Sequence, residues 1–145
     1  MKITLIAVGK LKEEYLKKAA ARFSEEIRRH CGFECIEIPD ESSESLPPET
    51  VMAIEGEGIL KRVRPQQHVI ALAIRGRQRT AEDFAVHLRE LNERGRDDLV
   101  FIIGGSLGLS DAVLNRADEK LSFSPMTFPH QLMRVMLMEQ LALHL

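Results

Sequence analysis

Two side chains near the end of the chain could take part in acid–base chemistry. His130 and Arg134 lie four residues apart in a segment predicted to be helical, so they share one face near its first turn. An imidazole can exchange a proton near neutral pH, and a guanidinium can stabilise a developing negative charge. His130 is therefore a candidate general base, and Arg134 its candidate electrostatic partner. The alternatives are a helix-start histidine bonded to backbone and an arginine in a structural salt bridge.

A glycine-rich turn follows a strongly apolar run. Gly104-Gly105-Ser106-Leu107-Gly108 comes directly after residues 99–103, L-V-F-I-I. The turn lacks the spacing G-x-G-x-x-G, and no Lys-Ser or Lys-Thr pair follows, so a phosphate-binding loop is disfavoured. Glycines at the carboxyl end of a strand serve where backbone approaches a ligand closely or takes positive φ. The turn therefore either borders a functional crevice or is a tight structural turn.

A loop bounded by prolines precedes an apolar helix in residues 121–140. Pro125 and Pro129 stiffen the loop, and a rigid loop with few backbone donors suits a flat, mostly uncharged adenine ring. The helix that follows is apolar on nearly every side, which predicts burial on more than one face. In a chain of this size such a helix indicates a subunit interface, or else the core helix of a monomer.

The charge balance limits how the protein could bind nucleic acid. A formal net charge of -2 and a pI of about 6.2 argue against coating nucleic acid through bulk positive charge, so any RNA contact must be local. Arg75, Arg77 and Arg79 follow a predicted strand and are the candidate contacts to an RNA backbone. The alternative is a solvated surface loop. A second basic cluster, residues 61–64, is interpreted as a solvated helix end.

The remaining histidines and the cysteines give no pattern of metal ligands, and no metal is predicted. Cys31 and Cys35 lack a second ligand pair and are interpreted as buried or half-exposed thiols. Four histidines have no partner at a useful sequence spacing and are interpreted as structural: His30, His68, His87 and His144.

The elements that must position these residues alternate along the chain. Strands are predicted at residues 1–8, 33–38, 69–74, 99–103 and 120–124. Helices are predicted at residues 11–30, 49–63, 80–91, 110–117 and from Pro129 onward, with a polar loop at 39–48. A capping box begins at Thr80, and Gly95 lies just past the end of that helix. The pattern predicts one α/β domain over residues 1–145, with a mostly parallel sheet of five to six strands.

The chain carries no segment that suggests a membrane or an export signal. The apolar run at residues 3–8 is too short for the core of a signal peptide, and no segment approaches membrane-spanning length. We therefore expect a soluble cytoplasmic protein that does not bind membranes.

Several long motifs carry a family resemblance. They are I-I-G-G-S-L-G-L-S at residues 102–110, R-A-D-E-K-L-S-F-S-P-M-T-F-P-H-Q-L-M-R at 116–134, and M-E-Q after them. The opening M-K-I-T-L-I-A-V-G-K and the central A-L-A-I-R-G-R-Q-R-T-A-E-D-F-A extend the match over nearly the whole chain. Together they resemble the RlmH family, bacterial methyltransferases of the SPOUT superfamily that modify N3 of a pseudouridine in 23S ribosomal RNA.

The resemblance implies a fold and a cofactor. The C-terminal part of the α/β domain would be tied in a trefoil knot that binds the methyl donor S-adenosylmethionine. Carried over by motif, the donor-binding residues would be Leu72, Gly105, Ser124, Pro125, Met126, Thr127, Phe128 and Pro129. The family acts as a homodimer that seats the RNA base between subunits, in agreement with the apolar last helix. The substrate would be 23S rRNA, free or in the assembled ribosome.

The resemblance also assigns roles and one departure. Methylation at N3 requires its proton to leave, which His130 could accept while Arg134 favours the anion. Family members usually continue after E-Q with Tyr-Arg-Ala and a tail that helps form the target pocket, whereas Ala142 and Leu143 stand in place of that Tyr and Arg. Two other interpretations are a module that binds S-adenosylmethionine without turnover because this tail is missing, and an unknotted flavodoxin-like nucleotide-binding domain.

Overall fold

A computed structural model describes residues 1–41 and 45–145 as a parallel sheet between two layers of helices. The strands run in the order β2-β1-β4-β3-β5, and each pairing is parallel. Along the chain the elements are β1 (Lys2–Val8), α1 (Glu14–Arg28), β2 (Gly32–Ile38), α2 (Pro48–Leu60), β3 (His68–Gln78), α3 (Ala81–Glu93), β4 (Asp98–Ile103), α4 (Asp111–Arg116), β5 (Glu119–Ser122) and α5 (His130–His144).

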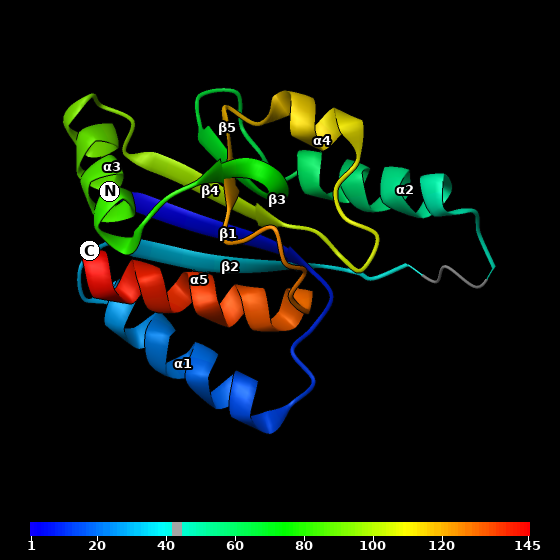
Figure 1. Ribbon diagram of the computed structural model, residues 1–145, viewed down its shortest axis with the longest axis horizontal. Helices are drawn as coiled ribbons and strands as arrows, with labels where there is room; N and C mark the ends of the chain where they lie inside the picture. The colour runs from blue at the N-terminus through cyan, green and yellow to red at the C-terminus, as the bar shows by residue number, and fades with distance from the viewer. Residues whose placement is uncertain (42–44) are drawn as a thin grey trace.

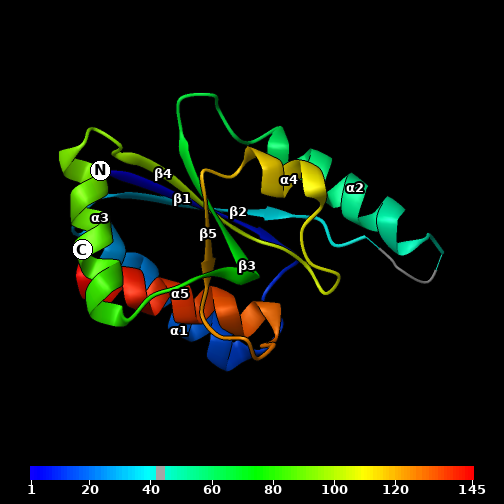
Figure 2. The ribbon, with the colours of Figure 1, turned by 45° about the horizontal axis from the view of Figure 1, so that its top comes forward.

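Alternating apolar side chains explain why helices cover both faces of the sheet. Ile3 and Leu5 of β1 belong to one core cluster together with α1, α3 and α5, whereas Ile6 and Val8 belong to a second cluster with α2 and α4. Successive strand residues point to opposite faces, so a strand that is apolar throughout needs cover on both. Figures 1 and 2 show α1 and α5 on one side of the sheet and α2 and α4 on the other.

The third strand is longer than its sequence pattern predicts. The apolar pattern predicts a strand at residues 69–74, but β3 continues to Gln78. It pairs with β5 twice, through Leu72 with Leu121 and, after a shift of register, through Arg77 with the same Leu121. A Cβ built on Gly76 would lie 2.7 Å from the backbone carbon of Lys120, so only glycine permits this close approach. The second half of β3 is mostly exposed and pairs with the edge strand β5, so its residues are polar. A search for apolar runs therefore does not identify it as a strand.

The other predicted elements are confirmed, with shifts of a few residues at their ends. The predicted helix at residues 11–30 is α1, and the glycine-containing helix at 49–63 is α2. The Thr80 hydroxyl accepts from the Asp83 amide at 3.0 Å, and Gly95 has a φ of 78°, as the capping pattern predicts. Pro129 is the residue before the first turn of α5 rather than within it. Residues 42–44 of the predicted loop at 39–48 lie outside the described residues.

Candidate active site

The segments predicted to bind the donor come together at the carboxyl ends of β4 and β5, beside Leu72 in the middle of β3. Leu72 of β3 pairs with Leu121 of β5, three residues before Ser124. On its other side β3 pairs with β4, where Ala71 lies opposite Ile102. Gly105 comes two residues after Ile103, the last residue of β4. At the same level of the sheet, Leu72 is the last buried residue in the first half of β3. In open parallel sheets this edge is where ligands bind.

The loop at residues 123–129 runs from β5 to the opposite half of the sheet. It ends at His130, which starts α5 beside Gly9 at the end of β1: a Cβ built on Gly9 would lie 3.6 Å from His130 Nε2. Because β5 is an edge strand and β1 lies beyond β3 and β4, the loop crosses the carboxyl ends of these two strands. Within the loop the Ser124 hydroxyl accepts from the Met126 amide at 3.0 Å. Pro125, Met126 and Thr127 are exposed.

The glycine turn leaves little room for a side chain at Gly104 or Gly105. A Cβ built on Gly105 would lie 3.1 Å from Val8 Cγ1 and 3.3 Å from Glu55 Oε1, and one built on Gly104 would lie 2.9 Å from the Gly108 carbonyl carbon. Gly108 has a φ of 86°, and its amide donates to the Gly105 carbonyl at 3.0 Å. The turn is thus a tight structural turn, and it also presents bare backbone at a strand end. These features fit a ligand that lies against backbone, such as S-adenosylmethionine.

Two hollows lie beside this set of residues rather than on it. One, of about 570 Å³, lies between α2 and α4. The other, of about 270 Å³, is lined by residues of β5, α3 and α5, among them Leu121 and Phe123, just ahead of the donor loop. Neither includes Gly105 or residues 124–129. A donor on these residues would therefore rest against the strand ends and under the loop, without filling either hollow.

Glu55 of α2 lies next to the glycine turn and was not singled out by the sequence. Its side chain is 4% exposed, and its Oε2 accepts from the Glu41 amide at 3.1 Å. Burial raises the pKa of the Glu55 carboxyl; the Glu41 amide opposes the rise, and the Asp40 and Glu41 carboxylates add to it. The only hint in the sequence was a charged residue in the mainly apolar part of a helix, beside Gly56.

His130 occupies a position suited to accepting a proton. Its ring is half-buried, with Nε2 near Gly9 and the Asp40 carboxylate. Burial lowers the pKa of His130; Asp40 opposes this, whereas Arg134 and Lys12 lower it further. Within residues 1–41 and 45–145 the ring makes no hydrogen bond to backbone, which disfavours the alternative of a backbone-bonded histidine. A neutral imidazole with a free nitrogen can act as a base.

Arg134 lies in the interior and is engaged with the protein itself. It is 2% exposed; its Nη1 donates to Glu37 Oε2 at 2.7 Å and its Nη2 to the Gly9 carbonyl at 2.8 Å. Its Nε is buried and has no acceptor among the described residues. Arg134 thus ties α5 to the ends of β1 and β2, the arrangement expected of the salt-bridge alternative.

The three arginines predicted to bind RNA have different surroundings. Arg75 and Arg77 are exposed on the outer half of β3. The side chain of Arg79 is 9% exposed, donates to Asp83 at 3.0 Å and lies 3.9 Å from Glu119. Two of the three guanidinium groups are therefore free to meet a phosphate.

A second polar network lies at the opposite end of the sheet and includes two of the histidines interpreted as structural. His68 and His87 have no partner at a useful sequence spacing, but both contact the Glu119 carboxylate, His87 Nε2 at 2.6 Å from Oε1. His68 Nδ1 accepts from Arg96 at 3.1 Å, so its proton is on Nε2, facing Glu119. These partners are 32 or 51 residues from Glu119 in the sequence, so helical spacing cannot reveal them. His144 also has a partner, Gln140, at 3.1 Å.

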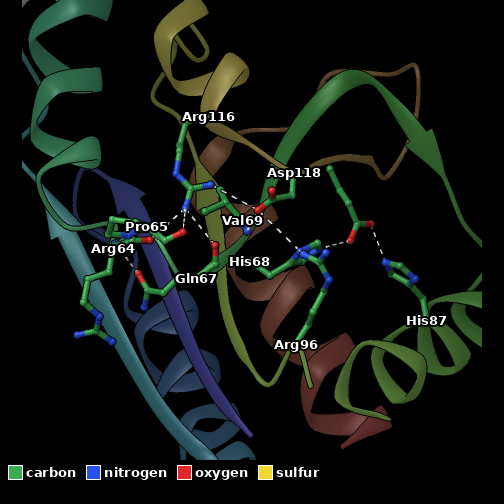
Figure 3. A network of polar contacts seen from close by, with 10 residues as sticks. Arg64, Pro65, Gln67, His68, Val69, His87, Arg96, Arg116 and Asp118 are labelled. Carbon is green, nitrogen blue, oxygen red and sulfur yellow. Dashed lines mark hydrogen bonds and ion pairs between the residues drawn. The ribbon is translucent and has the colours of Figure 1, made fainter. Parts of the chain in front are cut away.

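The same network fixes the start of β3. Arg116 donates to the carbonyls of Arg64 and Gln67, each at 3.0 Å, and Asp118 accepts from the Val69 amide at 2.8 Å. Figure 3 shows these side chains converging from the segment before β3 and from the end of α4. The contacts satisfy backbone groups at a strand start, so the network is structural.

The described part of the chain shows no metal site and no membrane-spanning helix. No group of three or more histidine, cysteine or acidic side chains in it could hold a metal ion. Cys31 and Cys35 are free and half-buried, as predicted, and burial raises the pKa of both thiols. No described helix is long and apolar enough to cross a membrane.

Comparisons with known proteins identify the family of the chain. Residues 1–142 match a family model described as predicted SPOUT methyltransferase. The chain is 49% identical over 145 residues to the ribosomal RNA large subunit methyltransferase H of Limosilactobacillus reuteri, covering 97% of this chain and 91% of that protein. A probable methyltransferase from Bordetella pertussis shares the fold, with a TM-score of 0.58 at 15% identity over 99% of this chain and 93% of that one. The methyltransferase AviRb from Streptomyces viridochromogenes, solved with S-adenosylmethionine, gives a TM-score of 0.50 at 10% identity over 97% and 57%.

Proposed function

This chain belongs to the SPOUT methyltransferase family, and we propose that it methylates ribosomal RNA of the large ribosomal subunit with S-adenosylmethionine as the donor. The target that the family resemblance implies is N3 of a pseudouridine in 23S rRNA. One observation carries the proposal: Gly105 and the loop at residues 124–129 follow the carboxyl ends of β4 and β5, and Leu72 of β3, the strand between them, lies at the same level. Sequence identity of 49% over nearly the whole length makes the same substrate class the best expectation.

The donor supplies an electrophilic methyl group on a positively charged sulfur. The protein's part is to hold it in line with the acceptor nitrogen, which is the main source of acceleration in such a displacement. Gly105 offers backbone without a side chain, and the proline-bounded loop covers the strand ends. We propose that the loop and the double pairing of β3 with β5 belong to a trefoil knot around the donor.

His130 is the candidate general base in this proposal. Its lowered pKa keeps the imidazole neutral at neutral pH, so it can take the proton that leaves N3. Both terminal nitrogens of Arg134 are bonded to Glu37 and Gly9, so it acts as a positioning residue that holds the start of α5, and with it His130, against β1 and β2.

Arg75 and Arg77 are the proposed contacts to the RNA backbone. Both are exposed on the half of β3 that follows Leu72, so a phosphate bound there would lie beside the donor site. The small net negative charge leaves selectivity to shape and local contacts rather than to bulk attraction. Arg79 is held by Asp83 and is left out of the proposed contact.

A homodimer is proposed on the uncovered face of α5. Leu143 is 66% exposed, and the hollow of about 270 Å³ at the same helix includes Met136 and Phe123. Apolar surface left on a helix that already packs against α1 and the sheet indicates a subunit interface.

We also propose a cytoplasmic location, because the proposed substrate is ribosomal RNA.

A methyl-transfer assay tests the proposal. Large subunits lacking the modification are incubated with the protein and tritiated S-adenosylmethionine, and donor binding is measured by calorimetry. We expect transfer by the natural chain and none by Gly105→Val, whose side chain would meet Val8 and Glu55. Gly32→Ala is the matched control, since its Cβ would lie 3.7 Å from the nearest atom, Lys2 Cγ.

The other outcomes each have a meaning. Donor binding without transfer would favour a binding module. If the natural chain neither binds the donor nor transfers its methyl group, the proposed function is overturned. Transfer to free 23S rRNA as fast as to assembled subunits would show that ribosomal shape is not needed.

A further inference from the structure

Glu55 is a buried carboxylate without a cation. At 4% exposure it has lost its water; its Oε2 accepts from the Glu41 amide at 3.1 Å, and its side chain also shares a hydrogen bond with the Asp40 side chain. Among residues 1–41 and 45–145 it forms no ion pair with lysine, arginine or histidine. Its nearest ionised neighbours are Asp40 and Glu41, which are also negative. Buried charges are normally paired, so this one calls for a positive partner.

The carboxylate is directed at the proposed donor site. Both oxygens face Gly105, at 3.3 and 3.6 Å from the point where a side chain would begin. Glu55 comes from α2, on the face of the sheet opposite α5, and its hydrogen-bond partner Asp40 also lies close to His130 at the end of β1. A ligand that lies against the Gly105 backbone would therefore have a negative charge beside it.

We propose that Glu55 stabilises the sulfonium charge of S-adenosylmethionine and so makes the site prefer the donor to its product. The inference rests on the proposed function. Loss of the methyl group converts the donor to S-adenosylhomocysteine, which keeps the adenine, the ribose and the amino acid end but loses the positive charge on sulfur. A carboxylate near that sulfur raises the affinity for the charged donor but not for the product, whose sulfur is neutral. This difference favours release of the product after transfer.

The ratio of the two affinities isolates this interaction. Glu55→Gln keeps the shape and the hydrogen-bond acceptor but removes the charge. We expect donor affinity to fall about tenfold, equivalent to about 1.4 kcal/mol, with product affinity nearly unchanged. Glu57→Gln is the matched control, because Glu57 lies on the same helix but is exposed and pairs with Lys61 at 3.5 Å.

Calorimetric titration of the natural chain and both variants with each ligand decides the matter, after thermal unfolding confirms that the variants fold. A selective loss of donor affinity in Glu55→Gln, and not in Glu57→Gln, is the expected result. An equal loss for donor and product would overturn the inference and indicate a hydrogen bond to a shared group. Unchanged affinity for both would also overturn it. Absence of donor binding by the natural chain would instead contradict the proposed function.

Discussion

The two ends of the sheet differ in whether their charged side chains have partners within the protein. At the amino ends of β3 and β5, Glu119 receives His68 and His87, and Arg116 and Asp118 bind backbone groups of the segment that starts β3. At the carboxyl ends, Glu55 has no cation and the Nε of Arg134 has no acceptor among the described residues. At the amino ends these polar side chains have partners within the protein. At the carboxyl ends a buried carboxylate lacks a cation and a buried N–H lacks an acceptor among the described residues.

This difference separates stability from function. Polar groups whose partners are all present stabilise the fold and leave nothing for a ligand. Buried polar groups without partners are costly, and proteins keep them where a ligand supplies the missing partner. The same residue types, histidine and glutamate, occur at both ends, so matched substitutions at the two ends can test the distinction.

The largest expected effect comes from exchanging histidines. His130→Asn should lower the methyl-transfer rate about 100-fold, because it removes the proposed base, with little change in stability. His87→Asn, at the other end, should lower stability by about 1 kcal/mol and leave the rate unchanged. Single-turnover transfer rates and urea unfolding measure the two quantities. Equal rate losses in both variants would remove the functional distinction between the ends.

The pH dependence sharpens the same point. Burial lowers the pKa of His130, so the neutral form persists as the pH falls below the ordinary histidine value. The transfer rate should therefore hold from neutral pH down to this lowered pKa and fall below it. In His130→Asn this decline should disappear from the rate profile, and an unchanged decline would assign the titration to another group.

Glutamate substitutions should give effects of opposite sign on stability. Glu119→Gln leaves two histidines without their carboxylate and should destabilise the protein by about 2 kcal/mol, without changing donor affinity. Glu55→Gln removes a buried charge that has no cation among the described residues and should stabilise the free protein at neutral pH by on the order of 1 kcal/mol. Urea unfolding of the ligand-free protein checks both, and destabilisation by Glu55→Gln would mean that its charge already has a partner.

The sign of the Glu55 effect with pH follows from its raised pKa. The folded protein binds this proton more tightly than the unfolded chain does, so protonation stabilises the fold at acid pH and the benefit is lost as pH rises through the folded pKa. The advantage of Glu55→Gln should thus be largest at neutral pH and should vanish at acid pH. Unfolding curves at several pH values measure it.

The smallest effect is expected outside both ends. Arg75→Gln and Arg77→Gln should each weaken binding to ribosomal RNA a few-fold and lower the salt dependence by about one phosphate contact. Arg79→Gln should act on stability instead, because its guanidinium is held by Asp83. Filter binding at several salt concentrations distinguishes them, and an equal salt slope for all three variants would refute the assignment.

Periodicity made most of the fold predictable. Runs such as residues 99–103 are apolar throughout because both sheet faces are covered, and capping at Thr80 fixed one helix start. The outer half of β3 was not predicted to be a strand, because its pairing with β5 depends on close backbone contact at Gly76 rather than on apolar side chains. Sequence patterns detect burial, and this half-strand is held by backbone at an edge.

The site was predictable where it is local in sequence. The glycine turn and the proline-bounded loop are continuous motifs, and the structure brings both to one edge of the sheet. Glu55 reaches Gly105 from a helix 50 residues away, and the partners of Arg134 are 97 and 125 residues away, so no spacing rule could have joined them. His68 and Glu119 were missed for the same reason.

Hydrogen–deuterium exchange with and without S-adenosylmethionine tests the central claim most directly, because it locates the bound donor along the chain. We predict that the donor slows exchange at residues 72–76, 104–108 and 122–131, with no change at residues 66–69 or 117–120, the paired end of the sheet. Slower exchange at the paired end, with the glycine turn and the loop unaffected, would contradict it.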